Sequence, residues 1–400
     1  MSTHNIPDIT QDIVVIGTGI AGVTTVREVR KLNENVTITL ITADDGTVYS
    51  KPMLSNALAL GKTPQSLVQK SAVQFGEDMN ATVRTGTRVV SINREDKTLV
   101  VDGTDGRSVI GYGRLVLATG ATPRAYQVEG SEDAPLHTVN DLDDYARWRS
   151  ALRPNARVLI IGAGLIGTEF ANDLAVAGHP VSVVDPAPWP LGRLLPEQMG
   201  RAMDAALGEA GVALHMGRTV TGMARADAEK DQGGWIARLD DATQVHFEIA
   251  LSAIGLIPNT DLAKAASLAV DQGICVDGFM RTSDPAIYAI GDCAQAAVGV
   301  LPYILPVMTE ARALAQTLTG TDTPVHLPAL PVSVKAPALA CVVCPPQPGA
   351  AGVWAVSGEG PDLKALFMGE NGQVLGFALT GTETKARQAM AKDMPHLMVA

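Results

Sequence analysis

Two copies of the pattern G-x-G-x-x-G, each directly after an apolar run, most constrain what this chain can fold into. They are Gly17, Gly19 and Gly22 in IVVIGTGIAG, and Gly162, Gly164 and Gly167 in RVLIIGAGLIG. In such a turn the first glycine makes the bend, the second lets the backbone approach a pyrophosphate, and the third lets helix and strand pack closely. One copy can be an ordinary glycine turn, but two copies in the same context predict two dinucleotide-binding units.

Composition and charge narrow the class of protein further. A chain of 400 residues with 46% hydrophobic content can build two to three domains. The net charge of −11 disfavours a nucleic-acid surface. The start MSTHNIPDITQD lacks the features of a signal peptide, and no apolar run suits a membrane-spanning helix. With only four scattered cysteines, we expect a cytoplasmic protein that binds no nucleic acid and does not insert into membranes.

The order of apolar runs and turn residues along the chain predicts the helices and strands. Each glycine motif belongs to a strand-helix-strand unit, over 12–17, 20–32 and 36–42 and again over 157–162, 165–177 and 181–185. The segment RVVSINREDKTLVVDG predicts a hairpin, and a helix is expected to begin near Pro306. From about residue 326, short strands and a terminal helix predict a small α+β domain.

Acidic residues at strand ends are candidate ribose ligands. Asp185 ends the second strand of the second unit, 23 positions after Gly162, where a carboxylate can bind ribose hydroxyls and repel the extra phosphate of NADP. It can alternatively cap the turn into Pro186. In the first unit Ala43 takes that position, so Asp44 is only a candidate. Asp292, at the end of AIYAIGD, is either a ligand contact or a turn aspartate.

Several separate segments carry a resemblance to a known family. The two glycine motifs, LVLATGATPR, TSDPAIYAIGDCA and the C-terminal region resemble the FAD-dependent pyridine nucleotide oxidoreductases of the glutathione-reductase type. Within that family, ITADDGTVYSKPMLS, GAGLIGTEFANDL, ARALAQTL, VSVKAP and DLKAL are similar to the rubredoxin-NAD reductases. The resemblance covers nearly the whole chain.

The resemblance implies an α/β fold with two Rossmann-like domains, for FAD and NAD, and a small C-terminal α+β domain. The expected boundaries are 1–118 with 248–325 for a discontinuous FAD-binding domain, 119–247 for the NAD-binding domain, and 326–400 for the C-terminal domain.

The resemblance also implies which residues hold the two cofactors. Those expected around FAD are Gly17, Thr18, Gly19, Gly22, Lys51, Val89, Thr119, Gly120, Gly291, Asp292, Ile304 and Val307. Those expected around NAD(H) are Gly162, Gly164, Leu165, Ile166, Gly167, Glu169, Asp185 and Gly255. Glu169 can alternatively be an ordinary first-turn glutamate, and Lys335 either tunes the flavin or is simply solvated.

The implied activity is NADH:rubredoxin oxidoreduction. A hydride would pass from NADH to flavin N5, and single electrons would then pass to rubredoxin, which supplies an alkane hydroxylase. No side chain is expected to be catalytic, because this chemistry needs positioning more than an acid or base. The regions that carry redox cysteine pairs in disulfide-reducing relatives contain none here, and Cys341 and Cys344 lie in an apolar, strand-like run. The histidines form no metal motif, so no metal is expected.

One departure and several alternatives stay open. Oxygenase-type relatives carry Leu-Ser-Lys where this chain has Leu54, Ser55 and Asn56, so the lysine expected to pair with Glu169 is missing. The acceptor can alternatively be a ferredoxin or a flavorubredoxin, or the chain can be an NADH-sensing flavoprotein with slow turnover. A monomer and a homodimer are both compatible with the sequence.

Overall fold

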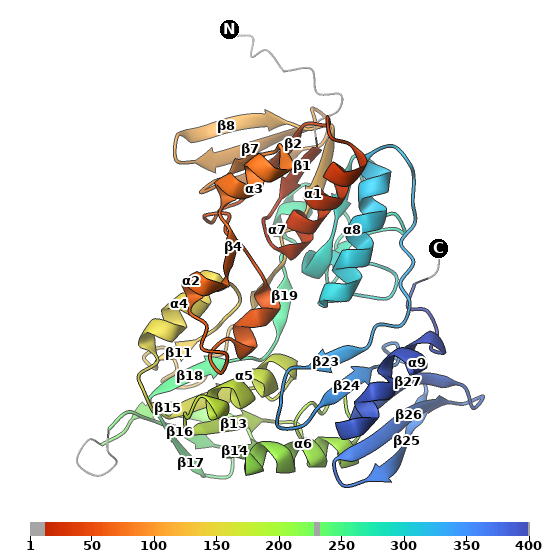
Figure 1. Cartoon of the computed structure of the whole chain (residues 1–400). Coiled ribbons are helices and arrows are strands. Elements are labelled where there is room, and N and C mark those ends of the chain that lie inside the picture. The colour runs from red at the N-terminus through yellow and green to blue at the C-terminus, as the bar shows by residue number, and fades with distance from the viewer. Residues whose placement is uncertain (1–12, 228–232, 399–400) are drawn as a thin grey trace.

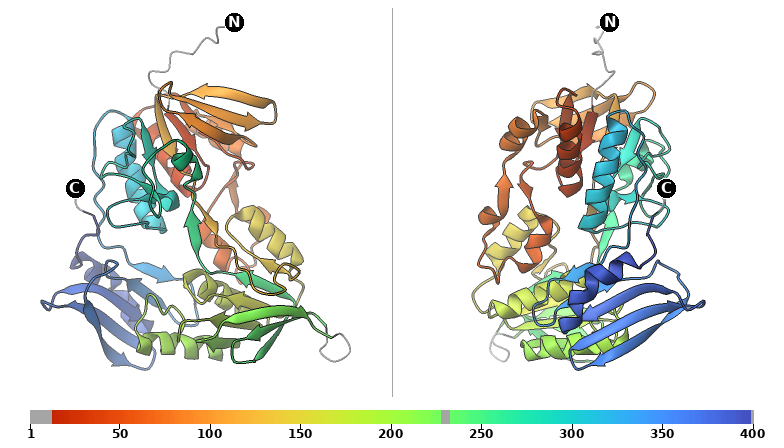
Figure 2. Two further views of the ribbon diagram at one scale, coloured as in Figure 1. Left: turned by 180° about the vertical axis from the view of Figure 1, so that it is seen from behind. Right: turned by 45° about the vertical axis from the view of Figure 1, so that its right-hand side comes forward.

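The computed structural model describes residues 13–227 and 233–398, whose elements gather around three five-stranded sheets (Figure 1). The sheet that contains the first glycine motif lies at one end of the molecule, and the other two lie side by side at the opposite end (Figure 2). Over these ranges, no helix combines the length and apolar character needed to cross a bilayer.

The first sheet forms around the apolar run IVVI, strand β1 (Ile13–Ile16), in which every residue is buried. All its strands are parallel, in the order β21-β9-β1-β2-β5. The partners are β2 (Ile38–Ile41), β5 (Thr82–Arg84), β9 (Arg114–Leu117) and β21 (Ile287–Ala289). Because a strand without alternation is buried on both faces, helices must cover the sheet. Helices α1 (Ile20–Leu32) and α8 (Ile304–Leu318) pack side by side on one face (Figure 2).

Smaller elements surround this sheet. The predicted hairpin is confirmed, and it carries a third antiparallel strand. These strands are β6 (Arg88–Asn93), β7 (Thr98–Gly103) and β8 (Gly106–Gly111). The remaining pieces are α3 (Ala72–Met79), α7 (Asp261–Ala265), β20 (Ile274–Cys275), η2 (Gly291–Cys293) and β22 (Ala294–Gln295).

The second sheet repeats the design around VLII, strand β12 (Val158–Ile161). It is parallel, in the order β11-β18-β12-β13-β14. Its other strands are β11 (Leu136–His137), β13 (Val181–Asp185), β14 (Val212–Met216) and β18 (Ile249–Ser252), with helices α4 (Leu142–Ala151), α5 (Leu165–Val176) and α6 (Glu197–Glu209). An antiparallel sheet of β15 (Val220–Arg225), β16 (Trp235–Leu239) and β17 (Gln244–Phe247) follows β14 in the chain.

The position of β18 corrects one predicted boundary. The sequence interpretation began the second FAD-binding segment at residue 248, but Ile249–Ser252 lies in the second sheet, between β11 and β12. All four residues are buried, and they pair in register with Val158–Ile161. A fully buried strand fits only where both faces are covered, so this segment completes the second sheet. The chain returns to the first part through β19 (Leu256–Pro258), which pairs antiparallel with β10 (Ala121–Pro123).

A segment between β2 and β5 leaves the first sheet and packs into the apolar cluster beside the second sheet. It contains β3 (Val48–Tyr49), η1 (Lys51–Asn56), α2 (Pro64–Leu67) and β4 (Val68–Lys70). Leu54 and Leu67 are buried in the same apolar cluster as Trp148 and Phe170. Figure 1 shows α2 beside α4, at the end of the molecule that holds the second sheet.

The third sheet is antiparallel, in the order β23-β24-β27-β26-β25. Its strands are β23 (Val332–Val334), β24 (Cys341–Cys344), β25 (Gly352–Glu359), β26 (Asp362–Gly369) and β27 (Val374–Thr380), followed by η3 (Gly381–Ala386) and α9 (Arg387–Lys392). Alternating burial along β26 shows one face packed and one face more open. The predicted α/β class with a C-terminal α+β part is confirmed.

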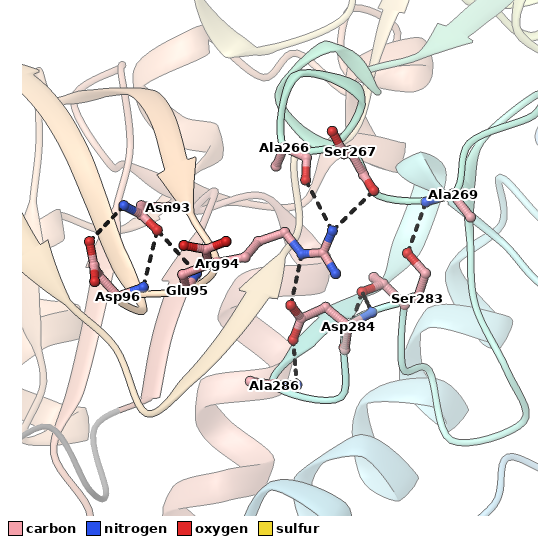
Figure 3. Close-up of polar contacts among 11 residues, drawn as sticks. Asn93, Arg94, Glu95, Asp96, Ala266, Ser267, Ala269, Ser283, Asp284 and Ala286 are labelled. Carbon is pink, nitrogen blue, oxygen red and sulfur yellow. Dashed lines mark hydrogen bonds and ion pairs between the residues drawn. The ribbon is translucent and has the colours of Figure 1, made fainter.

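A single arginine ties the hairpin sheet to the segment that leads into β21. Arg94, in the turn after β6, donates from Nε to Asp284 Oδ2 at 2.8 Å and from Nη1 to the carbonyl of Ser267 at 3.2 Å (Figure 3). Asp284 Oδ1 accepts the N–H of Ala286 at 3.0 Å, directly before β21. The guanidinium of Arg94 thus connects the hairpin sheet to two loops, one at Ser267 and one at Asp284.

We expect Arg94→Ala to lower the free energy of unfolding by about 1–3 kcal/mol, because it removes charge-assisted hydrogen bonds and leaves Asp284 without its cation. Thermal and urea unfolding would measure the loss. Arg107→Ala, at an exposed position on β8 of the same sheet, is the matched control and should leave the midpoint within about 0.5 kcal/mol. Equal stabilities of the two variants would contradict the role of Arg94.

Candidate functional site

The first glycine turn leaves a helix N-terminus open at the carboxyl edge of the first sheet. Gly17 has φ +110°, and a Cβ there would lie 2.2 Å from the carbonyl oxygen of Ala118. A Cβ on Gly22 would lie 2.0 Å from the carbonyl oxygen of Gly17. At Gly19, the N-cap of α1, a Cβ would meet nothing within 4 Å, and no side chain caps the helix. Free N–H groups facing open space fit a phosphate group.

Side chains from the neighbouring strand end line this turn. Thr18 Oγ1 donates to Thr42 Oγ1 at 3.1 Å, and Thr42 Oγ1 donates to Asp44 Oδ1 at 2.6 Å. The same carboxylate oxygen accepts the N–H of Gly46 at 2.9 Å. Asp44 is exposed and therefore accessible beside the turn. Its role as a ribose ligand stays a prediction.

A second group of predicted FAD residues combines Asp292, which follows β21, with Lys51, the first residue of η1. Lys51 Nζ donates to Asn140 Oδ1 at 2.8 Å, and burial lowers the pKa of Lys51 while the Asp292 carboxylate raises it. Burial raises the pKa of Asp292, and the Lys51 cation acts in the opposite direction. The two residues are thus electrostatic partners although they are far apart in sequence. Asn140 was missed by the sequence interpretation, and nothing in its local pattern distinguishes it.

Helix α8 presents another open N-terminus to this region. It begins at Ile304, two residues before the predicted start, because Tyr303 is still extended and the rigid φ of Pro306 suits the first turn. No side chain caps it, and Val307 is buried near the bend at Gly291. Its N–H groups favour a partial negative charge on a bound group, which fits the flavin of the FAD that the resemblance implies.

Thr119 and Gly120 lie where the chain crosses towards the second sheet. Thr119 Oγ1 donates to the carbonyl of Asn259 at 2.8 Å, and Asn259 Nδ2 donates back to the carbonyl of Thr119 at 2.8 Å. Gly120 has φ +65°, and a Cβ there would meet nothing within 4 Å. Asn259 directly follows AIGLIP, the segment that contains the predicted Gly255. The sequence interpretation could therefore have included Asn259, but it did not.

The predicted FAD residues therefore gather from separate strands at one edge. Gly17, Thr119 and Gly291 follow the carboxyl ends of β1, β9 and β21, which run in the same direction, and the candidate Asp44 follows the end of β2 beside them. Val89 lies apart from them on β6, where it is half-buried and pairs with Val101. The open turns, the uncapped helices and the half-buried, oppositely charged Lys51 and Asp292 fit a bound dinucleotide with a diphosphate.

The second glycine turn has the same geometry at the edge of the second sheet. Gly162 has φ +105°, and a Cβ on Gly167 would lie 1.8 Å from the carbonyl oxygen of Gly162. Around Gly164, the uncapped N-cap of α5, a Cβ would meet nothing within 4 Å. Leu165 and Ile166 form the first turn, and the Ile166 side chain is exposed. This turn also fits a phosphate group.

Asp185 supports the second turn through both carboxylate oxygens. Oδ2 accepts the N–H of Ala163 at 2.6 Å, and Oδ1 accepts the N–H of Ala187 at 2.7 Å. Asp185 therefore does cap the turn at Pro186, as the alternative interpretation expected. The contact also fixes the carboxylate at the end of β13, beside the glycine turn. Its ribose-binding role stays a prediction, as does that of Gly255, which has φ +104° and open space around it.

The buried Glu169 forms an ion pair with the half-buried Lys335 that the sequence interpretation did not expect. The Glu169 side chain is 1% exposed, and its Oε2 pairs with Lys335 Nζ and accepts Ser55 Oγ at 2.6 Å. Oε1 accepts the backbone N–H of Lys335 at 3.0 Å. The lysine of the related proteins is absent at position 56, as the sequence shows, but Glu169 has a different lysine as its partner. The cation comes from the residue after β23 in the C-terminal part, instead of from position 56.

Cys341 and Cys344 lie on opposite faces of β24. Cys341 packs into the cluster around the second sheet, and Cys344 packs into the cluster beneath α9. Residues three apart on a strand point in opposite directions, so the two thiols cannot approach each other. Burial raises the pKa of Cys341 to about 12 and that of Cys344 to about 11. Both raised pKa values favour the protonated thiols at neutral pH. Among the described residues, no cluster of His, Cys, Asp or Glu could hold a metal ion.

We expect Gly167→Ala to weaken NADH binding at least tenfold while leaving FAD bound, because the added Cβ forces the second turn apart and leaves the first untouched. Stopped-flow titration of flavin reduction with NADH would measure the change. Gly208→Ala, on α6 where a Cβ meets nothing within 4 Å, is the control in the same part of the molecule and should bind NADH normally. Unchanged NADH binding by Gly167→Ala would contradict the assignment of this turn.

Lys335→Met should destabilise the protein by about 1–3 kcal/mol at pH 8, because it strands the Glu169 carboxylate without its cation. In the double variant with Glu169→Gln, much of the stability should return, and thermal unfolding of all four proteins would measure the coupling. A purely additive cycle would contradict the ion pair.

Comparison with known proteins gives two family matches and close relatives. The model of the family described as pyridine nucleotide-disulphide oxidoreductase matches residues 11–317, and that of the rubredoxin binding C-terminal domain matches residues 324–394. A rubredoxin-NAD(+) reductase of Alcanivorax borkumensis is 42% identical over 96% of this chain and 99% of its own length. A nitric oxide reductase FlRd-NAD(+) reductase of Aeromonas salmonicida is 37% identical, with 97% of each chain covered. The solved covalent complex of putidaredoxin reductase with putidaredoxin superposes with a TM-score of 0.85 and 27% identity, covering 97% of this chain and 94% of that one.

Proposed function

Since the chain belongs to the pyridine nucleotide-disulphide oxidoreductase family, we propose that it is an FAD-dependent enzyme that passes electrons from NADH to rubredoxin. The observation that carries this proposal is the rubredoxin-binding domain that matches residues 324–394. In the structure, the third sheet packs against the apolar cluster beside the second sheet. Lys335, directly after β23, contacts Glu169 near the start of α5. The part that would bind the acceptor protein thus lies against the part that would bind NADH.

FAD would be held by the residues at the edge of the first sheet. The N–H groups at the start of α1 would bind its diphosphate, and Asp292, steadied by Lys51, would accept hydrogen bonds from hydroxyl groups. The open N-terminus of α8 would stabilise negative charge on the ring. When bound, FAD supplies the conversion between hydride transfer from NADH and single-electron transfer to an iron-sulfur protein.

NADH would be held at the edge of the second sheet. The turn Gly162–Gly167 would bind its diphosphate, and Asp185, already aligned by two backbone N–H groups, would accept bonds from a ribose. A carboxylate there repels the additional phosphate of NADPH, so NADH is the expected donor. Glu169 and Lys335, which pair with each other and contact η1, would tune the charge near the reacting rings.

The separation of Cys341 and Cys344 supports direct electron transfer from the flavin to the partner. A protein dithiol would need two thiols within bonding distance and at least one with a low pKa. Here the thiols occupy opposite faces of a strand, and burial raises the pKa of both. The flavoprotein thus needs no intermediate disulfide between its ring and rubredoxin.

A second acceptor class has a specific observation in its favour. The relative from Aeromonas salmonicida is called a nitric oxide reductase FlRd-NAD(+) reductase, and it covers this chain over 97% of its length. We therefore keep flavorubredoxin as the alternative acceptor. A slow NADH-sensing role and the supply of an alkane hydroxylase are proposals that rest on the sequence resemblance. A cytoplasmic location is a proposal that rests on the few, scattered cysteines.

We expect NADH to reduce the enzyme-bound flavin anaerobically at least tenfold faster than NADPH, because Asp185 disfavours a 2′-phosphate. Rubredoxin should then reoxidise the flavin faster than flavorubredoxin, a [2Fe-2S] ferredoxin or oxygen at equal concentrations. Stopped-flow absorbance at the flavin band measures both steps. Faster reduction by NADPH would overturn the donor assignment, and reoxidation by rubredoxin no faster than by oxygen would overturn the acceptor assignment.

A further inference from the structure

Glu310 is a buried carboxyl with little to stabilise a charge. It lies on α8 and is 6% exposed. Within the described residues its side chain accepts one hydrogen bond, from the N–H of Gly291 to Oε2, at a long 3.4 Å. By contrast, Glu169 has the Lys335 cation, and Asp173 accepts the N–H groups of Leu58 and Ala59 at 3.1 and 2.8 Å.

The side chains around Glu310 add negative charge. Asp292 follows Gly291 directly, and its carboxylate raises the pKa of Glu310. The Lys51 cation of η1 interacts with Asp292. Tyr303 and Cys293 have raised pKa values and are neutral.

The basic residues on the packed helices are directed elsewhere. On α1, Arg27 covers the ring of Phe75, Arg30 binds loop carbonyls, and Lys31 pairs with Glu28. On α8 itself the nearest basic residue, Arg312, is exposed. A proton is therefore the available counter-charge. Burial, the largest cause, raises the pKa of Glu310 to about 7, with the Gly291 N–H acting in the opposite direction.

The bend at Gly291 connects Glu310 to the start of α1. Gly291 has φ +77°, and a Cβ there would lie 2.8 Å from the Cβ of Ala21, which belongs to the first turn of α1. That turn is where the FAD diphosphate is proposed to bind. The diphosphate would bring two negative charges to a region that already holds Asp292 and Glu310.

We propose that Glu310 takes up a proton when FAD binds, so that a neutral carboxyl supports the Gly291 bend beside the diphosphate. The inference rests on the proposed FAD site and deepens it. The proton comes from solvent and adds to the carboxylate, and no electron moves. FAD affinity is then highest at a pH where Glu310 is already neutral. It falls as the pH rises through the pKa of the FAD-free protein, by up to tenfold per pH unit.

The test measures protons directly. Apoprotein is titrated with FAD by calorimetry at pH 7.5 in phosphate and in Tris, whose ionisation enthalpies differ, so that the difference in heat counts protons. Burial raises the pKa of Glu310 to about 7, so full protonation on binding at pH 7.5 should take up at most about 0.8 proton per FAD. Glu310→Gln keeps the shape of the side chain and should lose that contribution, whereas the control Glu209→Gln, exposed at the end of α6, should keep it.

A second readout follows FAD affinity by flavin fluorescence between pH 6.5 and 8.5. The wild-type Kd should rise at least threefold more across this range than the Kd of Glu310→Gln. Equal proton uptake by the wild type and Glu310→Gln, with parallel pH profiles of their Kd values, would overturn the inference and leave the FAD site standing. Failure of the wild-type apoprotein to bind FAD would overturn both. If the variant does not fold, zero proton uptake by the wild type alone still refutes the inference.

Discussion

Backbone atoms approach one another so closely at the two strand-to-helix turns that no side chain fits between them. The Cα of Gly22 lies against the carbonyl of Gly17, and the Cα of Gly167 lies against the carbonyl of Gly162. This contact sets the angle at which each helix leaves its strand and points the helix N-terminus over the edge of the sheet. The ends of the neighbouring parallel strands reach the same edge, so every residue proposed to touch a cofactor depends on those two contacts.

Three buried carboxylates around these edges are stabilised in three different ways. Glu169 has a lysine from the C-terminal part, Asp173 has two backbone N–H groups from the segment after η1, and Glu310 has one long contact beside Asp292. Burial raises the pKa of Asp173 to about 6 even with its two donors. The first two carboxylates hold separate parts of the chain together. The third has the weakest support and therefore the greatest tendency to exchange a proton.

The sequence was sufficient for features whose cause is local. Helix α1 spans the predicted residues 20–32, and the turn glycines lie where the spacing predicted, because strand, bend and helix are specified within about ten residues. Features that depend on pairing between distant segments were not accessible. The strand Ile249–Ser252 was assigned to the wrong sheet, since an apolar run carries no information about its neighbour. The Lys335–Glu169 pair was missed because the two residues are 166 positions apart.

The way the chain leaves and re-enters its first sheet also has a consequence for synthesis on the ribosome. The strand β21, at one edge of that sheet, is made after nearly three quarters of the chain, and the apolar side chains of Leu54 and Leu67 find their cover only when Trp148 and Phe170 have been made. The second sheet, which is complete by Ser252, can form while the first still has an open edge beside β9. A nascent chain thus exposes β9 for as long as it takes to make the intervening segment, and that open edge is the place where a holding chaperone would be needed.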